Sequence, residues 1–165
     1  MQDRIMGSET EWAMLLTENG KPNPLLIFDP ATEHCHILFN SIPSPPRLAS
    51  STQTERQFYG NGARIYVDTG NHCEYATGEV MGAEELVAHE KAGERIIECA
   101  VQTANQHQYF KERGWQLHSF KNNKDIAGNT YGAHENYCMT RKKIPESNFT
   151  VLSQRLIPFL MTRQL

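Results

Sequence analysis

The chain has 165 residues, of which 39% are hydrophobic, and its formal net charge at pH 7 is -3. This length suits one domain, since domains usually have roughly 100 to 200 residues, and the hydrophobic content is enough to build a core. The interspersed acids and bases form no basic stripe of the kind that a phosphate backbone requires, so we expect no nucleic-acid partner. No apolar run approaches the ~20 residues that span a bilayer, so we expect no membrane segment.

The cysteines predict a reducing compartment. They are scattered without paired spacing, at Cys35, Cys73, Cys99 and Cys138. The N-terminus also lacks the basic region and apolar run of a secretory signal. We therefore expect reduced thiols and a cytoplasmic location.

The first predicted element is a strand in the segment RIMGSETEWAMLL, residues 4–16. Its early part alternates, so Glu9 and Glu11 share one face, because side chains on a strand repeat every two residues. Two carboxylates on one face repel each other. That face is therefore either exposed to water, or it holds a cation between the two carboxylates.

Residues 19–57 are predicted to be mainly a loop insertion. Prolines and the polar run ASSTQTERQ make up much of this segment. A long irregular insertion in a compact domain is often functional or poorly ordered, and the sequence does not separate these two cases. Two apolar pieces, Leu25 to Phe28 and Ile37 to Phe39, are candidates for short strands.

The stretch NGARIYVDTGNHCEYAT, residues 61–77, begins with a dipeptide that suits a hairpin turn and continues as a strand. Alternation places Arg64, Tyr66 and Asp68 on one face of this strand and apolar residues on the other. Strands disfavour aspartate. We therefore interpret Asp68, together with Glu74 beyond the strand, as part of a site that holds a metal and an attacking group.

The remaining elements predict a mixed fold. Apolar residues recur at helical spacing between Ala83 and Gln106. The segment from Trp115 alternates as a strand does, and HENYCMTRK, from His134, is interpreted as a returning strand after a glycine-containing turn. A final amphipathic helix is predicted around Phe149 to Met161, with a kink at Pro158. Strands around two helices indicate an α+β fold, a sheet with helices on one face.

Carboxylates and a phenol from two predicted strands suggest a metal site. Glu9, Glu11, Tyr66 and Glu74 would offer hard oxygen ligands, which suit Mg²⁺ or Mn²⁺. Proteins usually bind Mg²⁺ through only a few carboxylates, and nucleotide phosphates supply further ligands, so such a site points to ATP. The sequence has no G-K-[ST] phosphate loop and no complete dinucleotide glycine motif, so a nucleotide must bind on the sheet in another way.

Zinc is the rival metal, because EHCHI at residues 33–37 and NHC at residues 71–73 bring histidines near cysteines. Adjacent residues of an extended chain point to opposite faces, and no C-x-x-C pair is present. The spacing therefore disfavours a tetrahedral structural zinc site.

Five blocks of the sequence, in order, closely resemble the Pup ligase and Pup deamidase/depupylase family of glutamine synthetase-like carboxylate-amine ligases. The blocks are RIMGSETEWAM, NGARIYVDTGNHCEYAT, KAGERIIE, FKNNKDIAGNTYGAHENY and LIPFLMTRQL. They span nearly the whole chain apart from residues 15–59. The resemblance implies a curved antiparallel sheet that forms an open cradle, with ATP and Mg²⁺ bound over its polar face.

The same resemblance implies roles for individual residues. It assigns Mg²⁺ to Glu9, Tyr66 and Glu74, with Glu11 as a further candidate, ATP to Arg64 and Thr77, and catalysis to Asp68. In a ligase this aspartate would accept a proton from an incoming lysine. In a depupylase it would activate water or a nucleophile.

The resemblance leaves two activities open. In the ligase branch, ATP phosphorylates the γ-carboxylate of the C-terminal glutamate of the modifier Pup, and a lysine of a substrate protein attacks the product. In the deamidase branch, the same site hydrolyses the side-chain amide or the isopeptide. The blocks IMGSETE, HCEYATGE, DIAGNTYG and MTRQL are closer to those of ligases, which favours a Pup-like modifier and lysine-bearing proteins as partners.

Family members run to several hundred residues, so residues 1–165 are expected to be the N-terminal part of a catalytic domain. A catalytically silent remnant that still binds a Pup-like protein is the alternative. Magnesium-dependent nucleotide binding would separate the two, since a remnant need not show it.

Overall fold

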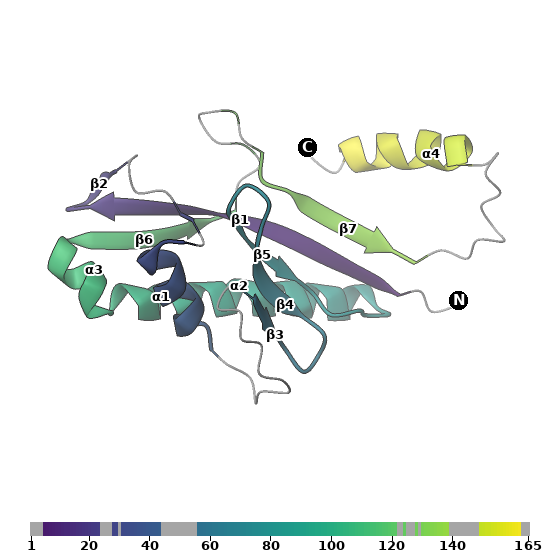
Figure 1. Cartoon of the computed structure of the whole chain (residues 1–165). Coiled ribbons are helices and arrows are strands. Elements are labelled where there is room, and N and C mark those ends of the chain that lie inside the picture. The colour runs from purple at the N-terminus through teal and green to yellow at the C-terminus, as the bar shows by residue number, and fades with distance from the viewer. Residues whose placement is uncertain are drawn as a thin grey trace.

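The computed structural model describes residues 5–23, 28–29, 31–43, 56–121, 124, 128, 130–138 and 149–162. Within these residues, the strands form one antiparallel sheet, and helices cover one of its faces (Figure 1). The strands are β1 (Met6–Glu18), β2 (Lys21–Pro22), β3 (Arg56–Phe58), β4 (Arg64–Asp68), β5 (His72–Ala76), β6 (Trp115–Phe120) and β7 (Ala133–Tyr137). The helices are α1 (Glu33–Ser41), α2 (Ala83–Asn105), α3 (Gln108–Arg113) and α4 (Phe149–Thr162). The predicted α+β class is confirmed.

The long strand β1 organises the sheet. Its N-terminal part pairs with both β5 and β7, and its C-terminal part pairs with β6 and, at the end, with β2. β4 then pairs with β5 on one side and β3 on the other. The strand at residues 133–137 thus pairs with β1, as does β6, because β1 is long enough for both strands to pair along it in succession.

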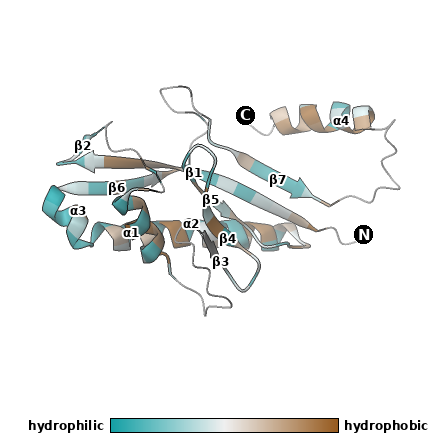
Figure 2. Ribbon diagram, viewed as in Figure 1, coloured by the Kyte–Doolittle hydropathy of each residue, from teal (hydrophilic) through white to brown (hydrophobic). Residues whose placement is uncertain are grey.

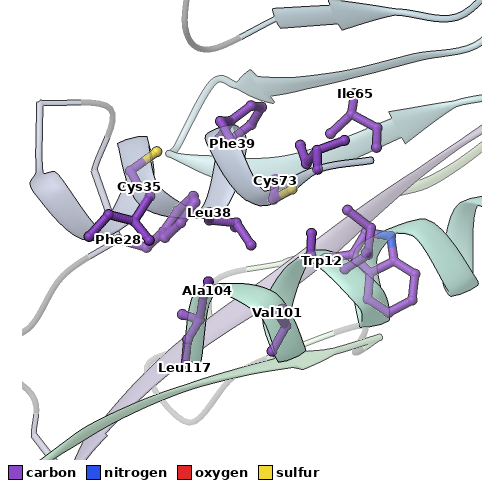
Figure 3. Packing of buried hydrophobic residues seen from close by; sticks show 14 of the residues in the cluster. Trp12, Phe28, Cys35, Leu38, Phe39, Ile65, Cys73, Val101, Ala104 and Leu117 are labelled. Carbon is purple, nitrogen blue, oxygen red and sulfur yellow. The ribbon is translucent and has the colours of Figure 1, made fainter. Parts of the chain in front are cut away.

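The hydrophobic core lies between the sheet and the helices α1 and α2. Trp12, Ile65 and Cys73 point from the sheet toward these helices (Figure 3). Gly93 of α2 lets the helix approach closely, since a Cβ at this position would lie 2.4 Å from Cδ1 of Tyr75. In β4 and β5, and at Trp12 of β1, the apolar side of the alternation is therefore used for packing, and polar side chains lie on the opposite face.

Helix α1 corrects one expectation. Residues 37–39, proposed as a short strand, belong to this helix. Cys35, Leu38 and Phe39 are all buried, and their spacing of three and four is that of one helical face. The other proposed strand is Leu25 to Phe28, and its first three residues lie outside the described residues. That residues 19–57 are an insertion stays a prediction, although this segment contains the helix α1.

The two helices predicted from the sequence are both present, and α3 is a further helix that was not predicted. The apolar periodicity from Ala83 corresponds to α2, and the hairpin turn at residues 61–62 connects β3 to β4. The C-terminal helix is α4, which contains Pro158 and has no buried residue. Most of α4 is hydrophobic, whereas β7 is mostly hydrophilic (Figure 2). In the described part of the chain, no helix has both the length and the apolar character to cross a membrane.

Candidate functional site

The face of the sheet opposite α2 carries a row of polar side chains across three neighbouring strands. Glu11 of β1 lies opposite Glu74 of β5, and Glu74 lies opposite Tyr66 of β4. Residues directly opposite each other in a sheet share a face. Glu9 and Arg64 flank Ala76 in the next row, so both also lie on this face.

Carboxylates from three strands come close together here. Ligand atoms of Glu11, Asp68 and Glu74 all lie within 4.8 Å of one another, and so do those of Glu9, Glu74 and His134. Glu74 belongs to both groups. Each group therefore has the spacing that a bound cation requires, and the shared carboxylate is at the centre.

Glu74 is the most unusual of these residues, because it is only 1% exposed and its Oε2 has no hydrogen-bond partner. Burial raises its pKa, and the nearby carboxylates raise it further, whereas a hydrogen bond with Tyr66 acts in the opposite direction. The pKa of Tyr66 is also raised, first by burial and then by Glu74. A buried carboxylate oxygen without a donor, facing other carboxylates, fits a divalent cation.

The carboxylates of Glu9, Glu11, Asp68 and Glu74 form an acidic row on this face. Arg64 lies at the edge of this acidic row. Its Nη2 lies 3.8 Å from Oε1 of Glu9, and its guanidinium lies 4.1 Å from the centre of the Tyr66 ring. Its side chain is 42% exposed. A guanidinium that is fixed by stacking but still reachable is well placed to contact a phosphate group.

Two hollows adjoin the acidic row. One, of about 370 Å³, is lined by residues that include Glu9, Ala76 and Thr77. The other, of about 220 Å³, runs along β4 and is lined by residues that include Arg64 and Asp68. A ligand larger than an ion therefore has space beside the carboxylates.

The structure brings most of the sequence-predicted residues together. Glu9, Glu11, Tyr66, Asp68 and Glu74 lie on one face. Alternation predicted this for Glu9 with Glu11 and for Tyr66 with Asp68, whereas Glu74 joins them because residues 72–76 form the strand β5. Arg64 contacts two of them. Thr77 lies just after β5, where its Oγ1 accepts a hydrogen bond of 3.0 Å from the Ser8 backbone N–H and faces the larger hollow. Their roles toward a metal, ATP and catalysis stay predictions.

Sequence reasoning missed two histidines. Nδ1 of His134 lies 3.2 Å from Oε2 of Glu9, and Nδ1 of His72 lies 2.7 Å from Oε2 of Glu11. Both histidines stand out in polar strand motifs, but only the pairing of β1 with β5 and β7 shows that they reach the site. In the described part of the chain, no cysteine joins a group that could hold a metal, and Cys35 and Cys73 are buried.

Comparisons with known proteins agree with this arrangement. Residues 4–165 match the family model described as Pup-ligase protein. The chain is 41% identical, over its whole length, to proteins named Pup--protein ligase from Mycolicibacterium vanbaalenii and Mycobacteroides abscessus, and it covers 33% of each. A protein of the same name from Nocardia farcinica is 40% identical over the same span. The chain thus spans about a third of the length of these relatives.

A solved structure shows the same fold. It is the crystal structure of the complex between the prokaryotic ubiquitin-like protein Pup and its ligase PafA. The match has a TM-score of 0.76 and 35% sequence identity, and it covers 98% of this chain and 30% of the other. With a family model that matches nearly every residue, the chain belongs to the Pup-ligase protein family.

Proposed function

We propose that this chain carries the cation- and nucleotide-binding face of an ATP-dependent ligase, which joins a Pup-like modifier to lysines of other proteins. In this reaction, the γ-carboxylate of the modifier's C-terminal glutamate takes the γ-phosphoryl group of ATP, and ADP leaves. A lysine amine then attacks the γ-glutamyl phosphate and releases phosphate, which leaves an isopeptide bond.

The observation that carries this proposal is the buried, partnerless carboxylate oxygen of Glu74 at the centre of the acidic face. Removing a charged group from water without a partner is strongly unfavourable. A fold that retains such a group on an open face is therefore best explained by a cation that the group binds.

The ligands of that cation would come from the acidic row. Glu9, Glu74 and Tyr66 are the proposed Mg²⁺ ligands, and Glu11 and His134 are close enough to add to them. Mg²⁺, when bound with ATP, would offset the negative charge of the phosphoryl oxygens. Arg64 would add a fixed positive charge at the same edge, and Thr77 would contact the nucleotide from the larger hollow.

Asp68 is the proposed proton acceptor. A lysine arrives as an ammonium and must lose a proton before it can attack, which requires a positioned base. Asp68 lies at the end of β4, within 4.8 Å of ligand atoms of Glu11 and Glu74. It also lines the hollow beside β4, through which an amine would approach.

The relatives favour ligation over deamidation. Proteins named Pup--protein ligase match this chain along its entire length. The solved complex contains Pup bound to its ligase PafA, which supports a Pup-like protein as the partner of this chain.

Two measurements test the proposal. The first is ATP binding to the chain by calorimetry, with Mg²⁺ and with EDTA, and we expect binding that depends on Mg²⁺. Equal binding in both buffers, or none in either, would contradict the cation site.

The second measurement uses a graft. This chain would replace the matching third of the Mycolicibacterium smegmatis ligase, and the graft would be mixed with ATP, Mg²⁺ and a modifier that ends in Glu or in Gln. Conjugation of the Glu form is expected. Ammonia release from the Gln form without conjugation would identify a deamidase instead.

A further inference from the structure

His72 lies at the edge of the acidic row and contacts two different parts of the chain. Its ring stacks on Tyr131, with ring centres 4.3 Å apart and planes 26° from parallel. Its Nδ1 is 2.7 Å from Oε2 of Glu11. A carboxylate has only acceptor oxygens, so the histidine donates this hydrogen bond.

Glu11 receives a second hydrogen bond on the same oxygen. The backbone N–H of Gly132 donates to Oε2 at 2.7 Å, and the backbone N–H of Glu11 donates to the Gly132 carbonyl at 3.0 Å. Both hydrogen bonds to the carboxylate fall on Oε2. Oε1 is therefore left available to face the other carboxylates.

Gly132 also limits what can approach Glu11. A Cβ at this position would lie 3.0 Å from Nε2 of His134 and 3.2 Å from Oε1 of Glu11. Both contacts are tighter than normal packing allows. Gly132 thus fits closely against Glu11, while its neighbour Tyr131 stacks on the ring of His72.

We propose that His72 is a positioning residue, which is held by Tyr131 and fixes Glu11 so that one carboxylate oxygen stays turned toward the cation site. This inference rests on the proposed function, because it assumes that the acidic row binds a divalent cation. Groups that orient a metal ligand usually change metal affinity by about 10- to 100-fold when they are removed. His72 would act in this way without contacting the ion.

The test is the affinity of the chain for Mn²⁺ alone, followed through the spin-resonance signal of the free ion, so that no turnover is required. His72→Phe keeps a ring against Tyr131 but removes the donor, and we expect it to weaken Mn²⁺ binding about 10- to 100-fold. His72→Asn places an amide nitrogen near the position of Nδ1, and we expect it to retain most of the affinity. His72→Gln reaches toward the position of Nε2 instead, and we expect it to behave like the phenylalanine variant.

Two controls make the result specific. Glu74→Gln removes a proposed ligand and should abolish binding. His118→Phe changes a histidine that also stacks on an aromatic ring, that of Phe120, and whose Nε2 lies 3.1 Å from Oγ1 of Thr17 on β1. It should bind Mn²⁺ normally, because it lies outside the acidic row.

The outcomes separate this inference from the proposed function. Loss of affinity in Glu74→Gln with unchanged affinity in His72→Phe would overturn the positioning role alone. Equal affinities of His72→Asn and His72→Gln would also overturn it, and this comparison stands even if the phenylalanine variant fails to fold. Absence of Mn²⁺ binding by the unsubstituted chain would overturn both proposals.

Discussion

Two glutamates approach β1 from opposite faces of the sheet, and their surroundings differ sharply. Glu90 of α2 accepts hydrogen bonds from the hydroxyl groups of Ser8 and Thr10, and Nζ of Lys121 lies 3.4 Å from its Oε2. Glu74 lies on the other face, where its surroundings supply a hydrogen bond with Tyr66 and three further carboxylates. One of its oxygens has no partner.

The difference shows which face of the sheet is organised for stability. On the covered face, a partly buried carboxylate is supplied with hydroxyl and ammonium donors, and hydrogen bonds to an ionised group are among the stronger ones. On the open face, acidic groups are gathered without enough donors, which lowers the stability of the protein when no cation is bound. Removing an acidic group from the open face should therefore impair binding or turnover without lowering the free energy of unfolding, whereas substitutions on the covered face should lower it.

The largest expected effect is on turnover. Asp68→Asn in the grafted ligase should lower the rate of conjugation by about 10²- to 10⁴-fold, because a positioned base contributes this much. Mg²⁺-dependent ATP binding should change little. The measurement is conjugate formed over time, with calorimetry on the same preparation. Conjugation at the original rate would rule out Asp68 as the base.

The next effect is on stability alone. Gly93→Ala should lower the free energy of unfolding by about 3 kcal/mol, because the new methyl group would overlap the Tyr75 ring and overpacking is costly. Gly82→Ala is a control at the start of the same helix, where a Cβ would meet nothing within 4 Å. Urea unfolding with fluorescence detection measures both. Equal free energies of unfolding for Gly93→Ala and Gly82→Ala would show that stability does not depend on the close approach of α2 to Tyr75.

The sharpest test of the comparison changes the two glutamates in parallel, without added cation. Glu90→Ala removes the acceptor of two hydroxyl groups and should lower the free energy of unfolding by about 1 to 2 kcal/mol. Glu74→Gln should raise it. Because burial and neighbouring carboxylates raise the pKa of Glu74, the unfolded chain releases this proton at lower pH than the folded protein does, so folding becomes less favourable as pH rises.

The increase in the free energy of unfolding caused by Glu74→Gln should therefore be present at pH 7.5. It should be small near pH 4, where the carboxyl group is mostly protonated in both the folded and the unfolded protein. Urea midpoints in EDTA at both pH values provide the measurement. A destabilised Glu74→Gln at pH 7.5 would mean that the carboxylate is satisfied in the folded protein, and the contrast between the two faces would disappear.

The smallest effect concerns Glu94 at the solvent edge of α2. Hydrogen bonds from Lys91 and then Lys121 hold its pKa below the usual range. The stability that this gives is present above the pKa of the unfolded chain, and it is lost as pH falls through the lower pKa of the folded protein. Lys91→Met should therefore cost only about 0.5 kcal/mol at pH 7, since Lys91 is 62% exposed. Urea unfolding of Lys91→Met and of the unsubstituted protein measures this cost, and the difference between their free energies of unfolding should vanish at pH 2.

Alternation along the chain was enough to place side chains on faces. It predicted that Glu9 and Glu11 share one face of β1, and that Arg64, Tyr66 and Asp68 share one face of β4. It could not show that β5 lies between these two strands, because strand pairing joins residues far apart in the sequence. The family resemblance grouped Glu9, Tyr66 and Glu74 in one expected site but gave no strand order, and the register of the sheet is what places β5 between β1 and β4.

Two features were beyond local patterns for physical reasons. Helix α1 lies among prolines and polar residues, and its short apolar pattern becomes clear only when it packs against α2 and the sheet. His72 and His134 reach the site because β5 and β7 pair with β1 in one particular register. A single sequence carries no direct signal for that register.

Strand β1 contributes alternate side chains to the acidic face and to the covered face of the sheet, and this limits how the strand can change in evolution. Inserting or deleting one residue near Thr10 would exchange the faces, so that carboxylates would enter the core while hydroxyl groups replaced them in the acidic row. A change of two residues would keep the alternation but separate Glu11 from Glu74. Natural variation in this strand is therefore expected to occur by replacement of side chains, whereas changes of length should be confined to the connecting segments.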